Sequence, residues 1–151
     1  MEPGDPEVLG DEWLRLAAHG SAPAAARRHV SAWLSAHHAA PEVVHDLALA
    51  VSELAANVVQ HSGTEWVFVR IDDHHPGWWT LEVVGGPRHL PDHLQDPARW
   101  TVAAPDSRRG GRGLGIVRSV VDEVEVDERG DELAIRCRRA RVPDQETTRH
   151  V

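Results

Sequence analysis

Glu53, Asn57 and His61 recur at four-residue steps along one segment of the chain. An α-helix turns once per ~3.6 residues, so this spacing places a carboxylate, an amide and an imidazole along one helix edge. The amide oxygen suits Mg²⁺ beside substrate phosphates, and the carboxylate can take a proton from an attacking hydroxyl. The imidazole can donate to a phosphate oxygen. The stripe favours magnesium and phosphate chemistry, although spacing alone fits plain surface positions about as well.

A glycine-rich run further along the chain is a second candidate for anion binding. Gly113 and Gly115 leave backbone N–H groups free at the start of the helix expected to follow, and Arg112 can add a charged donor. Taken alone, the run is also typical of a flexible linker before a helix. Its position after a long connection, residues 85–111, favours a lid over phosphates, since long loops in compact domains are usually functional or disordered.

The helix that carries the stripe is expected to begin at Pro41 and to end near Gly63. Its apolar positions repeat at three and four, which predicts a buried face beside the polar stripe; they are Val44, Leu47, Val51, Leu54 and Val58. An earlier helix is predicted from Ser21, a capping hydroxyl, to about His38.

Strands and a third helix complete the predicted domain. Period-two patterns predict an edge strand at 12–18, a hairpin at 65–72 and 78–84, and a second hairpin at 124–127 and 132–138. The third helix follows Gly115. This order predicts an α+β fold, a two-layer α/β sandwich in which helices cover one face of an antiparallel or mixed sheet. Residues 11–141 are expected to form the single domain, with flexible tails at 1–10 and 142–151.

Bulk composition excludes several classes of function. A chain of 151 residues with a formal net charge of −8 is one domain without the basic face that nucleic acids require. No segment approaches the ~18 apolar residues of a membrane span. Cys137 is the only cysteine, which excludes an internal disulfide and fits a cytoplasmic location. The chain has no lysine, so no phosphate-binding loop that depends on lysine is available.

Residues 52–61 resemble the N box of the GHKL (Bergerat-fold) ATP-binding domains, and residues 111–115 resemble their second glycine box. The most similar branch is the stand-alone anti-sigma-factor serine kinases of actinobacteria, to which residues 23–28 are also similar. The resemblance covers roughly residues 12–140. It implies the Bergerat-type, histidine-kinase-like ATPase fold, with ATP and Mg²⁺ as ligands.

The resemblance also implies roles for individual residues. Asn57 would hold Mg²⁺ against the triphosphate, and Glu53 would be the general base that acts on a substrate serine. His61 matches a position that lines the nucleotide site. The residues expected to close over the phosphates are Arg112, Gly113, Leu114 and Gly115.

One position departs from the family pattern. The family's first glycine box begins with an Asp that accepts a hydrogen bond from the adenine amino group, but here Gly85 stands in that place, followed by Gly86. A buried contact of this charged kind is worth about 1.5–3 kcal/mol. Its loss would weaken ATP about tenfold to a hundredfold. The phosphate half of the site is therefore expected to be intact and the adenine half impaired.

Two functions remain in view. The first is a Mg-ATP-dependent serine kinase that sequesters a sigma factor and phosphorylates an anti-anti-sigma (STAS-domain) protein, as the resemblance implies; Glu53 and Asn57 favour it. The second is a nucleotide-impaired module that sequesters a transcription regulator without kinase activity, which Gly85 favours. A sensor histidine kinase is less favoured, because no helix pair carrying a phospho-accepting histidine precedes the domain. A homodimer is expected by resemblance only.

Overall fold

The computed structural model describes residues 6–9, 12–61, 63–85, 95–100 and 111–141. The helices are α1 (Ala22–Ala36), α2 (Pro41–His61), α3 (Gly111–Val120) and the short 3-10 helix η3 (Pro97–Arg99). The strands are β1 (Glu7–Val8), β2 (Trp13–Ala17), β3 (Trp66–Asp72), β4 (Trp78–Gly85), β5 (Glu123–Arg129) and β6 (Glu132–Ala140). No helix within these ranges is long and apolar enough to cross a membrane.

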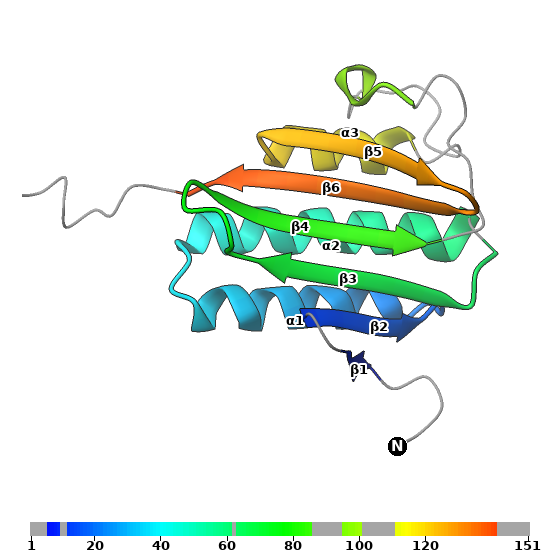
Figure 1. The fold of residues 1–151 in the computed structure, drawn as a ribbon, viewed down its shortest axis with the longest axis horizontal. Coiled ribbons are helices and arrows are strands. Elements are labelled where there is room, and N and C mark those ends of the chain that lie inside the picture. The colour runs from blue at the N-terminus through cyan, green and yellow to red at the C-terminus, as the bar shows by residue number, and fades with distance from the viewer. Residues whose placement is uncertain (1–5, 10–11, 62, 86–94, 101–110, 142–151) are drawn as a thin grey trace, which may run out of the picture.

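The strands form one sheet in the order β1-β2-β3-β4-β6-β5, and α1, α2 and α3 all lie on the same side of it (Figure 1). This confirms the predicted two-layer α+β sandwich. Of the antiparallel and mixed alternatives, the sheet follows the first, since every pairing among the described strands is antiparallel. The reason lies in the connections. Two successive helices, α1 and α2, return the chain to the end of the sheet where β2 finished, so β3 runs in the opposite direction.

The boundaries of α2 follow the sequence closely. The helix begins at Pro41 and ends at His61, and Gly63 follows with a left-handed φ of 67°. Helix α1 ends earlier than expected, at Ala36, because His38 adopts a left-handed φ of 62°. Ser21 occupies the N-cap of α1, but its hydroxyl makes no capping hydrogen bond. The long α2 therefore runs alongside the strands and carries the polar stripe in its C-terminal part (Figure 1).

A hydrophobic core fills the space between the helices and the sheet. Helix α2 contributes its largest share through Val43, Leu47, Ala50, Val51, Leu54, Ala55 and Val58. Val44, which the sequence placed on this face, is only partly buried. On β6 the Cys137 side chain is fully buried, and this burial raises the pKa of its thiol to about 12. The thiol therefore stays protonated and unreactive in the folded chain.

The N-terminal strand extends the sheet by one position. Strand β1 lies within the segment 1–10 that was expected to be a tail, and it pairs with β2 so that Glu7 faces Arg15. These two side chains form an ion pair. Strand β2 is consequently the second strand of the sheet rather than its edge.

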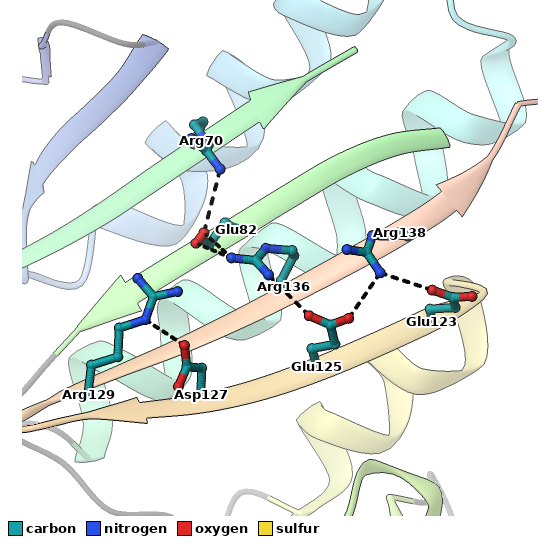
Figure 2. Close-up of polar contacts among 8 residues, drawn as sticks. All are labelled: Arg70, Glu82, Glu123, Glu125, Asp127, Arg129, Arg136 and Arg138. Carbon is teal, nitrogen blue, oxygen red and sulfur yellow. Dashed lines mark hydrogen bonds and ion pairs between the residues drawn. The ribbon is translucent and has the colours of Figure 1, made fainter. Parts of the chain in front are cut away.

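The face of the sheet opposite the helices is polar, and Figure 2 shows its charges in a row across four strands. The Glu82 side chain on β4 is almost fully buried, and Arg136 donates to its two oxygens at 3.3 and 3.4 Å. Arg70 lies 3.7 Å away on the other side. The row continues through Glu125 and Arg138 toward β5. Each charge is thus matched by an opposite one, which offsets the cost of burying Glu82.

Candidate functional site

Two segments that are far apart in sequence meet beside the polar stripe of α2. Helix α3 packs against α2, and its first turn lies against Glu53 and Asn57. The contact at Gly113 is close, because a Cβ atom built there would lie 2.9 Å from Glu53 Oε2 and 4.0 Å from Asn57 Nδ2. Three of the predicted site residues therefore lie together, from two different elements. Glycine at position 113 is what leaves room for the Glu53 carboxylate.

The side-chain amide of Asn57 is buried without a partner. The residue is only 4% exposed, and its Nδ2 atom has no hydrogen-bond partner among the described residues. A buried polar group left unsatisfied costs about 1–3 kcal/mol. Because the amide lies next to the first turn of α3, it fits a ligand that brings its own oxygen atoms, such as a phosphate with its magnesium ion.

The first turn of α3 is built differently from the sequence prediction. The helix begins at Gly111 rather than after Gly115, so the glycine-rich run is itself helical. Within this helix the N–H groups without an intrahelical partner are those of residues 111–113, because the fourth helical residue makes the first i−4 hydrogen bond. Of the two predicted backbone donors, Gly113 has a free N–H, whereas the N–H groups of Leu114 and Gly115 fall within the helical hydrogen-bond ladder. Leu114 and Gly115 are also buried, which anchors this turn to the core.

A helix start of this kind favours negative charge. The aligned peptide dipoles place partial positive charge at the N-terminus of α3, within reach of the Glu53 carboxylate. No hydrogen bond or ion pair links Glu53 to another residue in the described ranges. The carboxylate is half-buried and available to accept a proton from a hydroxyl that approaches it.

The opposite side of α2 meets the end of β4. A Cβ atom built on Gly85 would lie 2.6 Å from Val58 Cγ1 and 2.9 Å from Val58 Cγ2. The backbone of Gly85 is not left-handed, so space rather than φ demands glycine here. Val58 is 6% exposed and belongs to the core. No side chain, an Asp included, can extend from position 85 while Val58 keeps its place.

Other predicted site residues are only partly described. His61 is the last residue of α2 and Arg112 lies in the first turn of α3, but both side chains lie outside the described part of the structure. Gly86 lies outside it entirely. Within the described residues, no group of three or more His, Cys, Asp or Glu side chains could hold a metal. A magnesium ion held by one amide oxygen, phosphates and water needs no such group.

A cavity of about 330 Å³ lies on the opposite face of the sheet. Its lining residues are Leu9, Trp13, Phe68, Val84, Arg129 and Glu132. None of them belongs to the predicted site, and Val84 points away from the helices while its neighbour Gly85 faces α2. The cavity and the Asn57 region are therefore separated by the thickness of the sheet.

Val58 is the site residue that sequence reasoning missed. Its apolar side chain at helical spacing predicted a core position, which is correct. Gly85 was the sequence signal that a side chain is missing at the end of β4. The sequence did not show that Val58 fills the space of that side chain. The two residues are far apart in the chain, and only the packing of β4 under α2 joins them.

Comparisons with known proteins agree with this geometry. The family model described as histidine kinase-like ATPase domain matches residues 16–138. The crystal structure of the RsbU and RsbW domains of a Mycobacterium tuberculosis protein has a TM-score of 0.58 at 16% identity, covering 87% of this chain and 33% of that chain. A chain of the SiaB-SiaC complex from Pseudomonas aeruginosa has a TM-score of 0.57 at 15% identity, covering 85% and 88%.

Each of these two structural likenesses shows a shared fold and no more. This chain spans about a third of the length of the Mycobacterium tuberculosis chain. A search of curated proteins finds no significant match.

Proposed function

The chain belongs to the family of histidine kinase-like ATPase domains, and from this premise we propose that it is a Mg-ATP-dependent protein serine kinase with a regulatory role. The observation that carries the proposal is the buried side chain of Asn57, whose Nδ2 atom has no hydrogen-bond partner among the described residues, beside Glu53 and Gly113. A site without a ligand has little physical reason to keep such an amide, because a leucine would fill the same volume without the unsatisfied donor.

The binding roles divide between the two helices. The Asn57 amide oxygen holds the magnesium ion, and its N–H group donates to a phosphate oxygen. The first turn of α3 covers the phosphates with its free backbone N–H groups, that of Gly113 among them, and Leu114 anchors this turn to the core. From sequence, Arg112 and His61 add donors at the rim, and Gly115 lets α3 pack tightly. Bound Mg-ATP supplies the γ-phosphoryl group for transfer.

Glu53 acts as the general base in this proposal. It accepts the proton of the substrate serine hydroxyl as the new oxygen–phosphorus bond forms, and ADP leaves with the electrons of the broken bond. The position of the Glu53 carboxylate against Gly113 supports this role, because it lies at the start of the helix that would cover the phosphates. Any larger residue at position 113 would displace the base.

The partners are proposed from the resemblance of residues 52–61 and 111–115 to anti-sigma-factor kinases. They are a sigma factor that the chain sequesters and a STAS-domain anti-anti-sigma protein that it phosphorylates. The SiaB-SiaC structure, which shares the fold, is itself a complex of two proteins. A homodimer and a cytoplasmic location also remain predictions.

The second candidate function is a binding module that sequesters a regulator without using nucleotide. The observation in its favour is the contact of Gly85 with Val58, which leaves no room for an acid that could read adenine. This candidate predicts the same protein partner but no phosphate transfer.

Calorimetric titration separates the two functions. Mg-ATP and Mg-ADP are titrated into the full chain and into Asn57→Ala; the kinase proposal expects saturable binding by the wild type and its loss in the variant. An absence of saturable binding by the wild type up to millimolar nucleotide would refute the kinase and leave the binding module.

A transfer assay then tests the base. Glu53→Ala should bind Mg-ATP almost as the wild type does but transfer phosphate to a STAS-domain protein far more slowly. Glu53→Gln serves as the matched variant, because it keeps the shape of the side chain and removes only its ability to accept the proton. Undiminished transfer by both variants would remove Glu53 as the base.

A further inference from the structure

Resting on the proposed nucleotide site, we infer that this chain recognises its ligand as a magnesium polyphosphate, with little selection for the base attached to it. Val58 is the residue that sets this breadth, because its side chain occupies the space into which a base-reading side chain at position 85 would extend.

The first step of the argument is that the contact between Gly85 and Val58 cannot relax easily. Val58 is β-branched and lies within a helix, where one χ1 rotamer is strongly preferred, so its methyl groups cannot turn away at little cost. The backbone of Gly85 is held as well, since the last residue of β4 pairs with Leu133 of β6. Leu133 is itself buried, at 4% exposed. Neither side of the contact has room to retreat.

The second step concerns what base selection requires. An active site rejects the wrong base strongly only when it holds a buried polar group that the right base satisfies and the wrong one leaves unpaired. At this end of α2, the two described residues that meet are a glycine and a valine, and neither offers a side-chain donor or acceptor. Two buried apolar positions of this kind cannot tell a 6-amino group from a 6-oxo group.

The third step is that, in the part of the site that the structure describes, the polar groups lie on the phosphate side. Asn57 presents its unpartnered amide there, and the first turn of α3 presents free N–H groups. These groups recognise phosphate oxygens and a metal ion, which ATP, GTP and inorganic tripolyphosphate all carry. Affinity therefore comes from the shared part of these ligands, and the base adds mainly non-selective packing.

The test compares three ligands on the full-length wild-type chain by calorimetry in excess magnesium: ATP, GTP and inorganic tripolyphosphate. We expect the dissociation constants of ATP and GTP to agree within about threefold, and that of tripolyphosphate to lie within about tenfold of them. ATP binding at least tenfold tighter than GTP would overturn the inference and leave the nucleotide site standing. Binding of none of the three would refute the proposed nucleotide site as well.

Two variants test whether Val58 is the cause of the weak base selection. Gly85→Asp alone should lower the melting temperature without creating a preference for ATP, because its Cβ atom meets the valine methyl groups. The double variant Gly85→Asp with Val58→Ala should recover stability and prefer ATP to GTP at least tenfold. Val58→Ala alone, the matched control, should stay unselective. A Gly85→Asp protein as stable as wild type and selective for ATP would show that Val58 does not set the breadth.

Discussion

Gly85 and Gly113 both face α2, and they differ in what a side chain would meet in their place. At Gly113 the nearest atom is the carboxylate oxygen of Glu53, at the far end of a flexible side chain. At Gly85 the nearest atoms are the branched methyl groups of Val58, held in the core. The first glycine makes room for a reactive group, and the second makes room for packing. Helix α2 thus has a polar edge toward α3 and an apolar face toward β4.

A nucleotide site usually combines phosphate binding with base recognition. In the proposed site, this difference assigns the two tasks to different faces of α2. Asn57 and Val58 are adjacent in the chain, yet the amide lies next to α3 and the valine contacts β4. Changes on one side should therefore leave the other largely intact. Four substitutions test that separation, in order of the effect that we expect.

Asn57→Leu should have the largest effect, and in two opposite directions. Removing the amide should weaken Mg-ATP binding about a hundredfold, or roughly 2.7 kcal/mol. The free energy of unfolding without ligand should rise by about 1 kcal/mol, because an unsatisfied buried donor is replaced by apolar atoms of similar volume. Calorimetry and urea denaturation measure the two quantities. A destabilised variant that still binds Mg-ATP would contradict both expectations.

Gly85→Ala should be the most destabilising of the glycine changes. The new Cβ atom would overlap the Val58 methyl groups, and overpacking of this kind costs about 1–3 kcal/mol. Adding Val58→Ala should recover part of the loss, so the double variant should be more stable than the sum of the single changes predicts. Urea denaturation of the four proteins in this cycle gives the coupling energy. Strict additivity would mean that the two side chains do not compete for space.

Gly113→Ala should leave stability nearly unchanged but slow the reaction. The added methyl group displaces a flexible carboxylate at little cost, and alanine favours the helix by up to about 1 kcal/mol over glycine. Phosphate transfer should fall about tenfold because Glu53 no longer lies in place, whereas Mg-ATP binding should change less. Single-turnover transfer and calorimetry separate the two. A loss of stability as large as that of Gly85→Ala would erase the distinction between the two glycines.

Arg138→Met, on the sheet face opposite the helices, should have the smallest effect. It serves as the control for the substitutions on and around α2. The side chain of Arg138 is about one-third exposed and pairs with Glu123 and Glu125. Pairs of this kind contribute about 0–1 kcal/mol, screened further by salt. We expect a stability change within that range and unchanged Mg-ATP affinity. A weaker affinity would indicate coupling through the sheet between its two faces.

The sequence predicted helix α2 and the placement of Glu53 and Asn57 on it well, because its information there is local. Pro41 and Gly63 mark the ends of α2, and the four-residue spacing of Glu53 and Asn57 places both on one edge whatever the rest of the fold does. The order of elements was enough to predict the two-layer sandwich. The start of α3 at Gly111 was missed because glycine is a weak helix former, and tertiary packing of Leu114 overrides that preference.

The close packing of Gly85 against Val58 was harder to predict, because it is a contact between segments that are distant in the sequence. Gly85 signalled that a side chain was missing, but nothing in the sequence links it to Val58. The antiparallel direction of all described pairings was likewise hidden, since it depends on how α1 and α2 return the chain. Local patterns specify helices and spacing, whereas close approaches between elements depend on the assembled sheet.

The strand order also has a consequence for how the chain folds. The register joins Gly85 of β4 to Leu133 of β6, so the pairing at the middle of the sheet closes a loop that contains η3, α3 and β5. Closing long loops before their contacts form costs entropy and slows folding. The α1–α2 hairpin can form early from local contacts, but Gly113 reaches Asn57 only when that loop has closed. We therefore expect ligand binding to arise abruptly, at the last step of refolding.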